Sequence, residues 1–357
     1  MKRLSILFLC FCTLLLFSCN NRSKEDIEEE VSSGVALIQN ASYYEMILQN
    51  GDRLYFSSYD EKEGIKGLAF ARDSVKVSYS YGTGFLISDD GKLVTNAHVV
   101  SNMASDKDVN KSMANIIEMV KAAVEMEFEQ RSAQLKKVTR IFQAAYYDNS
   151  LSIAAYYELT ELQQALINAK NDLAQTYTSL DRIDTRRTII KYHNAVGVAF
   201  DNTYITSNND YQPCVIKAKD MAHDLAVIQL KDKKSPVNRY IFDVPTDDPI
   251  DTYSMRDKFT KSLDEDKNGT LFMIGFNLGP SLALTKDGVK HQFNMGTISQ
   301  KTDERLMYSI PTLPGSSGSP VVNKKGELVA INYAGLTGTQ SFNYGIRVKY
   351  LNQLINR

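Results

Sequence analysis

Hydrophobic residues along this chain follow two main patterns, which together predict a mainly β protein with one long helical interruption. Residues 43–58, YYEMILQNGDRLYFSS, contain two apolar, aromatic-rich runs joined at Asn50-Gly51, as is typical of a β-hairpin. Short β-type runs continue through GKLVTNAHVV and resume near residue 195 with NAVGVAFDNTYITS, PCVIKAKDMAHDLAVIQL, TLFMIGFNLG and GELVAINYAG. Many short strands separated by turn signals favour a sandwich or barrel over alternating βα units.

The helical interruption lies between Ser101 and Val196, where the chain has neither glycine nor proline. Apolar residues recur there every three or four positions, first over Met113–Ala145 and again over Leu159–Ile183. That alternating spacing is typical of a coiled-coil seam. We therefore predict two long helices, 109–146 and 153–184, which form an antiparallel hairpin inserted into the β domain.

The first residues have the composition of an export signal. MKRLSILFLCFCTLLLFSCNN starts with two basic residues and continues with an apolar run that is short for a membrane-spanning helix. An ordinary signal peptide and an uncleaved anchor are the alternatives. The hydrophilic SKEDIEEE that follows predicts a solvated tether over 19–33.

The segment LFSC at the end of this signal resembles the lipobox of bacterial lipoproteins. The resemblance implies a lipoprotein signal peptide over 1–18 and a lipid on Cys19 that anchors the mature protein to a membrane. We therefore expect an exported bacterial lipoprotein at the outer membrane, on its periplasmic side or at the cell surface.

Composition and charge exclude several function classes. Lys and Arg number 41 against 42 Asp and Glu, and this near-neutral balance is not that of a nucleic-acid binder. The four histidines are scattered without the spacing of a metal site, so we expect no metal and no cofactor. Once the signal is removed and Cys19 carries a lipid, Cys214 is left alone, and we expect it to be a buried small hydrophobic residue.

Three separated segments carry residues that are suited to nucleophilic catalysis. His98 ends the apolar run VTNAHVV, Asp224 precedes the apolar run LAVIQL, and Ser317 lies in LPGSSGSPVV among small residues. Each has an ordinary alternative, since a lone histidine can be structural and an Asp before a strand can simply complete a turn. An unaided serine hydroxyl is a weak nucleophile, so the serine needs a base and a group that orients that base.

Taken in the order His, Asp, Ser, these segments resemble the chymotrypsin-fold serine proteases, in character nearest the HtrA-type and bacterial glutamyl-endopeptidase branches. The matching pieces are GTGFLIS (82–88), TNAHVV (95–100), DLAVIQL (224–230), MIGFNLG (273–279) and GSSGSPVVNKKGELVAIN (315–332). The resemblance implies a double six-stranded β-barrel of chymotrypsin type that carries the helical hairpin as an insertion. We expect the first barrel over 34–104 and 188–240, the insertion over 105–187 and the second barrel over 241–357.

The resemblance also implies the roles of single residues. Ser317 would attack the scissile carbonyl, His98 would take its proton, and Asp224 would hold the imidazole in the correct tautomer. The backbone N–H groups of Gly315 and Ser317 would form the oxyanion hole. Ser316 stands where trypsin-like zymogens have an Asp, so activation by N-terminal cleavage is not expected. His223, next to Asp224, is expected to be incidental.

The primary specificity pocket is expected around AINYAG, residues 330–335. The predicted substrate-binding residues are Thr312, Asn332, Tyr333, Ala334 and Gly335. Asn332 stands where the resembling glutamyl endopeptidases have a histidine, so a preference for acidic side chains is not expected. Thr312 and Asn332, with the apolar residues around them, predict that the pocket prefers a small, uncharged side chain.

These observations predict a serine endopeptidase that cleaves protein or peptide substrates through an acyl-enzyme. The alternative is a catalytically silent protease-fold scaffold whose helical insertion associates with itself or binds a partner.

Overall fold

The chain consists of two compact units in the computed structural model, which describes residues 23–102, 104–148, 150, 152–251, 269–335 and 342–356. The first unit combines the residues up to 41 with 79–102 and 194 onward, and the second combines 42–78 with 103–193. The predicted signal over 1–18 and Cys19 lie outside the described residues. Among the described helices, none has the length and apolar character needed to cross a membrane.

The first barrel is an antiparallel sheet that closes on itself because β1 (Val35–Ile47) also pairs with β7 (Ile189–Phe200). In spatial order its strands are β1, β5 (Ser78–Leu86), β6 (Lys92–Thr95), β9 (Leu225–Leu230), β8 (Gln212–Asp220) and β7. Every residue of β9 is buried, whereas β8 largely alternates between buried and exposed positions, as a strand with one solvent face does.

The second barrel is closed as well. Its spatial order is β10 (Thr270–Gly275), β13 (Gln292–Lys301), β14 (Arg305–Tyr308), β17 (Asn343–Arg347), β16 (Leu328–Gly335) and β15 (Pro320–Asn323). Between β10 and β13 lie α7 (Pro280–Ala283) and the hairpin of β11 (Leu284–Thr285) and β12 (Gly288–Val289). The prediction of a mainly β, double six-stranded barrel of chymotrypsin type with a helical insertion is confirmed.

Short helices complete the barrel unit, and one of them corrects a prediction. Residues 24–31 form α2 (Lys24–Val31), in which Ile27 and Val31 are fully buried in the hydrophobic core. The prediction of a solvated tether over 19–33 is therefore wrong for this helix. The two apolar residues lie four positions apart and so share one face of the helix, while the acidic residues occupy the other faces. Further helices in the described part of this unit include α3 (Ala97–Val100), α8 (Val348–Ile355) and the 3₁₀ turns Ser32–Gly34 and Asn208–Asp210.

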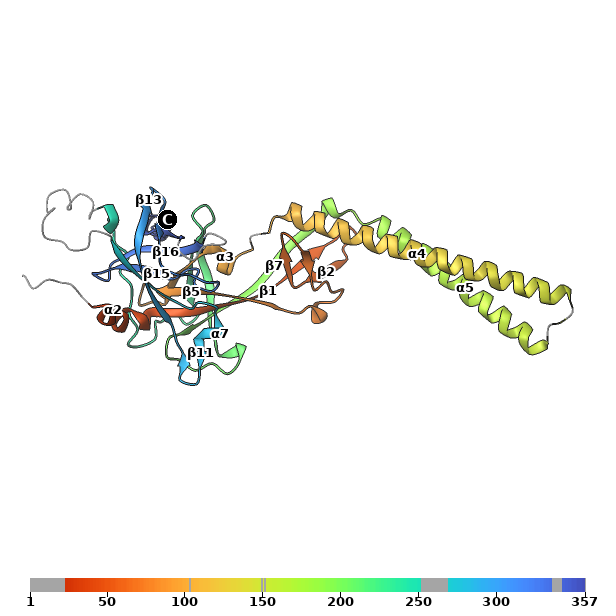
Figure 1. Ribbon diagram of the computed structural model, residues 1–357, viewed down its shortest axis with the longest axis horizontal. Coiled ribbons are helices and arrows are strands. Elements are labelled where there is room, and N and C mark those ends of the chain that lie inside the picture. The colour runs from red at the N-terminus through yellow and green to blue at the C-terminus, as the bar shows by residue number, and fades with distance from the viewer. Residues whose placement is uncertain are drawn as a thin grey trace, which may run out of the picture. The chain divides into compact units, whose positions relative to one another are not determined.

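The second unit contains the predicted helical hairpin. Helices α4 (Asp106–Tyr147) and α5 (Ile153–Asp181) run side by side (Figure 1). Helix α4 extends beyond both ends of the predicted range 109–146, whereas α5 begins where predicted and ends before residue 184. Each starts at a serine whose side chain accepts an N–H of the first turn, Ser105 for α4 and Ser152 for α5. Farther along, the rings of Phe142 and Tyr156 lie 5.4 Å apart.

The β strands of the second unit pack beneath the start of α4. The predicted hairpin is present, with β1 joined to β2 (Arg53–Phe56) through a turn in which Gly51 has a φ of +88°. The rings of Tyr44 and Phe56 stack at 4.6 Å and share a core with Val109 and Met113. The strands β3 (Ser58–Asp60) and β4 (Gly64–Lys66) and the 3₁₀ turns Arg72–Ser74 and Thr185–Arg187 complete this unit.

Candidate active site

His98 and Asp224 lie in the first barrel, at the ends of two paired strands. His98 belongs to α3, the single helical turn that follows β6, and Asp224 directly precedes β9, which pairs with β6. The carbonyl of Asp224 accepts hydrogen bonds from the Ala97 N–H at 3.1 Å and from Asn96 Nδ2 at 2.9 Å. The start of α3 is thereby tied to the residue whose carboxylate faces its histidine.

The Asp224 carboxylate holds His98 with both oxygens. Asp224 Oδ2 lies 2.6 Å from His98 Nδ1, and Asp224 Oδ1 accepts the backbone N–H of His98 at 2.9 Å. Asp224 has a φ of +52°, a left-handed conformation that Asp tolerates better than most residues. Because a carboxylate only accepts, Nδ1 carries the proton of the neutral ring, and Nε2 is the nitrogen available as a base.

Ser317 is half-buried and lies in the connection between β14 and β15, where two glycines permit a tight path. Gly315 and Gly318 have φ values of +99° and +88°. A Cβ on Gly318 would lie 2.1 Å from the carbonyl oxygen of Thr83, and one on Gly315 would lie 2.4 Å from that of Phe276. Both positions therefore require glycine, for conformation and for space.

The Ser317 segment lies against strand β5, next to α3. The Thr83 N–H donates to the carbonyl of Ser317 at 2.8 Å. A Cβ on Gly82 would approach both Val99 Cγ1, at 2.6 Å, and the Ser317 carbonyl oxygen, at 3.2 Å. The structure thus brings the nucleophile candidate and the residue after His98 to the same strand. In the part of the chain that is described, no hydrogen bond joins the Ser317 hydroxyl to His98.

Two backbone N–H groups of this segment stand out because their neighbours are all engaged. The N–H groups of Ser316, Gly318 and Ser319 donate to backbone carbonyls. Within the described residues, those of Gly315 and Ser317 have no acceptor. The carbonyls of residues 313–317 all accept hydrogen bonds. In chain order, their donors are Ser316 N, Leu278 N, Thr83 Oγ1, Asn332 Nδ2 and Thr83 N. The segment therefore offers two N–H groups, on residues separated by Ser316, to an anion.

The predicted pocket residues lie on or beside strands β14, β16 and β17. Thr312 Oγ1 donates to Asn343 Oδ1 at 2.7 Å. Asn332 is 1% exposed, and Tyr333 is half-buried, with the Arg305 guanidinium 5.3 Å from its ring centre. Burial raises the pKa of Tyr333. Ala334 and Gly335 continue β16, and a role of these five residues in substrate binding stays a prediction.

Sequence reasoning did not single out Thr83, although it lies in the quoted segment GTGFLIS. Its hydroxyl donates to the Gly315 carbonyl at 2.9 Å and accepts the Phe276 N–H at 3.0 Å. Its own carbonyl accepts Thr95 Oγ1 at 2.8 Å. A buried threonine in a strand has no distinguishing signal in the sequence, because its partners are brought to it only by the fold.

The other titratable groups are engaged elsewhere. His223 bonds to Asp220 and its ring stacks on Tyr350 at 4.0 Å. Burial raises the pKa of the Cys214 thiol to about 12, so this cysteine is not a thiolate nucleophile at neutral pH. Among the described residues, no group of three or more His, Cys, Asp or Glu side chains is placed to hold a metal ion.

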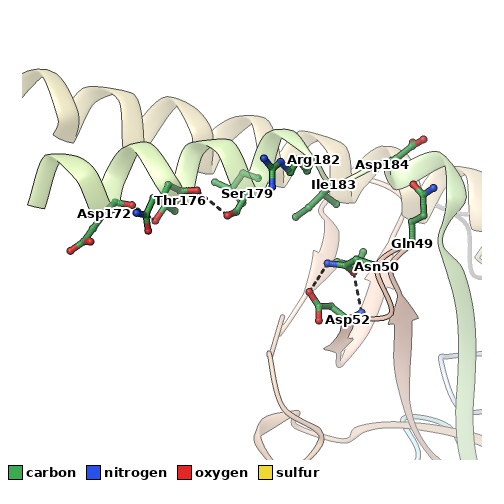
Figure 2. Close-up of a pocket in the computed structure, with 12 residues that line it drawn as sticks. Gln49, Asn50, Asp52, Asp172, Thr176, Ser179, Arg182, Ile183 and Asp184 are labelled. Carbon is green, nitrogen blue, oxygen red and sulfur yellow. Dashed lines mark hydrogen bonds between the residues drawn. The ribbon is translucent and has the colours of Figure 1, made fainter. Parts of the chain in front are cut away.

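A cavity of about 920 Å³ lies in the second unit, between the turn that follows β1 and the end of α5 (Figure 2). Asn50 and Asp52 line one side, where Asn50 Nδ2 donates to Asp52 at 2.7 Å, and Thr176, Ser179 and Arg182 line the other. None of the candidate catalytic residues lines this cavity.

Residues 178–331 match the family described as the trypsin-like peptidase domain. The matched segment contains Asp224 and Ser317, whereas His98 precedes it. No curated protein matches the sequence.

Two similar solved structures are the serine endoprotease from Yersinia pestis and the HtrA-type protease AlgW with a tripeptide. They are 13% and 12% identical to this chain, each with a TM-score of 0.42 and each covering 94% of it. The present chain covers 66% and 63% of their lengths, just under two thirds. The double barrel and the matched segment make this chain similar to the trypsin-like peptidases.

Proposed function

We propose that this protein is a serine endopeptidase that hydrolyses peptide bonds through an acyl-enzyme. Ser317 is the nucleophile, His98 the general base and acid, and Asp224 the residue that orients His98. The N–H groups of Gly315 and Ser317 form the oxyanion hole.

The strongest support for the proposal comes from the N–H groups of Gly315 and Ser317, which have no acceptor among the described residues. Buried backbone groups are nearly always hydrogen-bonded, and this segment satisfies the carbonyls of residues 313–317. In the part of the chain that the structure describes, these two N–H groups lack an acceptor, an arrangement that a fold used only as a scaffold does not need. An oxyanion hole requires that arrangement, because its acceptor forms only during the reaction.

The reaction proceeds in two halves. Ser317 Oγ attacks the substrate carbonyl carbon while its proton passes to His98 Nε2, and Asp224 stabilises the imidazolium that results. The carbonyl oxygen becomes negative and accepts the N–H groups of Gly315 and Ser317. When the C–N bond breaks, Nε2 returns the proton to the leaving amine and the acyl group stays on Ser317. Water, activated by the same imidazole, then releases the acid.

The place of action and the substrate preference are part of the same proposal. The sequence pattern of the first 19 residues supports export and a lipid anchor on Cys19, at the outer membrane of a bacterial envelope. The proposed substrates are proteins or peptides at the envelope, and the pocket around Thr312, Tyr333, Ala334 and Gly335 is proposed to prefer a small, uncharged side chain.

Loss of the Ser317 hydroxyl tests the catalytic role. Ser317→Ala is expected to lower the cleavage of casein by roughly 10⁶-fold without a change in the melting temperature. Ser319→Ala is the matched control, since the buried Ser319 hydroxyl has no hydrogen-bond partner in the described structure. Equal cleavage by wild type and Ser317→Ala would refute the proposal.

A second candidate function, a silent protease-fold scaffold, is favoured by exposed aromatic side chains at the far end of the α4–α5 hairpin. Tyr146, Tyr147 and Tyr157 are 65%, 84% and 62% exposed. Tyrosines are enriched at protein interfaces. If both the wild type and Ser317→Ala are inactive, yet the wild type associates with itself and the variant with serine at all three tyrosines does not, this second function replaces the first.

A further inference from the structure

The geometry of the peptide bond explains how the two N–H groups of the Ser317 segment are aimed. In a trans peptide the C=O and the following N–H point in opposite directions, so a held carbonyl fixes the direction of its N–H. The Gly315 N–H shares a peptide with the Pro314 carbonyl, which accepts the Leu278 N–H at 2.6 Å. The Ser317 N–H shares a peptide with the Ser316 carbonyl. Whatever holds the Ser316 carbonyl therefore directs the N–H of the nucleophile.

Two donors hold the Ser316 carbonyl, and one of them is a side chain. Asn332 Nδ2 donates to it at 3.0 Å and the Ser319 N–H donates at 3.1 Å. Asn332 Nδ2 also lies 3.2 Å from Ser316 Oγ. Asn332 comes from β16, whereas the other donor lies within the same tight turn. The side chain of Asn332 is thus the anchor that ties this peptide to the body of the second barrel.

Tyr308 determines which end of the Asn332 amide faces the peptide. The Tyr308 hydroxyl donates to Asn332 Oδ1 at 2.8 Å, so the oxygen end is turned toward β14 and the NH₂ end toward Ser316. Tyr308 is fully buried, and burial raises its pKa well above the ordinary value, so the hydroxyl keeps its proton. Tyr308 therefore donates to the Asn332 oxygen, and the Asn332 NH₂ group donates to the Ser316 carbonyl.

The backbone of Asn332 is engaged with the same segment. Its carbonyl accepts the Gly318 N–H at 2.8 Å, and its N–H donates to the Ser319 carbonyl at 2.9 Å. Both backbone groups and both ends of the side-chain amide are thus occupied by protein partners. A side chain that is 1% exposed and fully engaged is suited to hold the loop and not to contact a substrate, which departs from the substrate-binding role predicted for Asn332 from the sequence.

We infer that Asn332, oriented by Tyr308, is a positioning residue that keeps the Ser316–Ser317 peptide turned so that the Ser317 N–H faces the developing oxyanion. The inference rests on the proposed peptidase function. All of these contacts lie within the second barrel, so the loop is ordered without a newly cut chain terminus. Without the Asn332 donor, the Ser316 carbonyl keeps only a local partner, and the peptide is free to rotate its N–H away.

The first test separates kcat from KM. Asn332→Ala, and Asn332→Asp, which keeps the size but replaces the donor end, are expected to lower kcat by about 10²-fold, the effect of losing one oxyanion donor. KM is expected to stay within about threefold, because no substrate contact is removed. Tyr308→Phe is expected to have a smaller effect, about tenfold in kcat. Asn352→Ala is the matched control, since Asn352 Nδ2 also donates to two backbone carbonyls, those of Pro245 and Thr246.

The second test needs no catalysis. Hydrogen–deuterium exchange of the segment 313–319 is expected to be roughly tenfold faster in Asn332→Ala than in wild type, while exchange in α8 is unchanged. A variant with wild-type kcat and wild-type exchange in this segment would overturn the inference, and so would a variant altered only in KM. If Asn332→Ala does not fold, Tyr308→Phe decides by the same two measurements.

The two proposals fail in different ways. If wild type and Ser317→Ala cleave casein equally, the peptidase function is refuted, and exchange in the segment 313–319 then decides alone whether Asn332 positions this peptide. If wild type is active and the Asn332 variants match it in kcat and exchange, only the positioning role is refuted.

Discussion

Two histidines of the barrel unit, His98 and His223, are held by aspartates in the same way. The two pairs differ in their separation along the chain and in their surroundings, and we propose a catalytic role for only one of them. In both pairs one carboxylate oxygen accepts the backbone N–H of the histidine and the other contacts Nδ1. His98 and Asp224 are 126 residues apart, whereas His223 and Asp220 are three residues apart in one turn. The local pair completes a turn, while the distant pair joins two strands.

The surroundings of the two rings differ more than the pairs themselves. The His223 ring is covered by Tyr350 of α8 at 4.0 Å. Beside His98, Val99 packs close to Gly82, and the N–H of the next residue of that strand, Thr83, donates to the Ser317 carbonyl at 2.8 Å. A histidine–carboxylate pair alone is therefore not a sign of catalysis. Under the proposed function, the distinguishing feature of the His98–Asp224 pair is its place near the Ser317 segment, in which the N–H groups of Gly315 and Ser317 have no acceptor among the described residues.

Removal of each imidazole is expected to separate the two histidine–aspartate pairs by the largest effect. His98→Ala is expected to lower kcat by about 10⁶-fold, because the serine loses its base, whereas His223→Ala is expected to leave kcat within about twofold of wild type. Casein cleavage under saturating substrate measures both. A comparable loss in the two variants would show that the pairs are not distinguished by their surroundings.

Replacement of each carboxylate is expected to affect kcat in one pair and stability in the other. Asp224→Asn is expected to lower kcat by about 10⁴-fold, because the amide stabilises the wrong tautomer of His98. Asp220→Asn, the matched variant of the local pair, is expected to lower stability instead. Burial of Asp220 acts to raise its pKa, but the hydrogen bonds from His223 and Ala222 together with the charge of His223 outweigh burial and lower the pKa. Its contribution is thus present above the ordinary carboxyl pKa and is lost as the pH falls.

His223, which stacks on Tyr350, is expected to contribute to stability and not to catalysis. His223→Ala removes the contact with Tyr350 and the bonds to Asp220, and it is expected to lower the free energy of unfolding by about 1–2 kcal/mol. Urea denaturation measures this value. No change in the denaturation midpoint, together with a change in kcat, would reverse the roles assigned to the two histidines.

The smallest expected effect concerns a third histidine, His291, which contacts Asp201 at 2.9 Å and Glu28 of α2 at 3.1 Å. Burial of the ring opposes protonation, but these two carboxylates outweigh it and raise the pKa of His291 above its ordinary value of 6.5. The protonated ring therefore stabilises the fold fully below pH 6.5, and this contribution is lost as the pH rises through the higher pKa of the folded state.

Thermal unfolding measured against pH tests this linkage. His291→Gln is expected to lower the melting temperature by a few degrees at pH 6 and by less at pH 9. An equal difference at both pH values would contradict the role of protonation.

Elements with a strong periodic pattern were predictable from the sequence. The helical hairpin and the β1–β2 turn followed from apolar spacing and from Asn50-Gly51. Helix α2 was not recognised, because its two buried residues, Ile27 and Val31, stand among acidic residues. Short acidic segments look solvated unless the surface that covers their apolar face is known.

The candidate site was predictable only where residues could be assigned by resemblance. Ser317, His98 and Asp224 were assigned from their order in the chain and from the residues around each, because no single segment is specific enough alone. The contacts of Thr83 and the engagement of the Asn332 amide could not be anticipated, because each depends on backbone groups from distant strands. The fold brings these partners together, and their residue types alone carry no signal.

Covalent labelling tests directly whether Ser317 is a nucleophile activated by His98. The wild-type protein treated with a fluorophosphonate, digested and analysed by mass spectrometry should carry the phosphonyl group on Ser317. The label should be retained in His223→Ala and absent from His98→Ala. A wild-type protein that stays unlabelled, or that is labelled on a serine other than Ser317, would contradict the account.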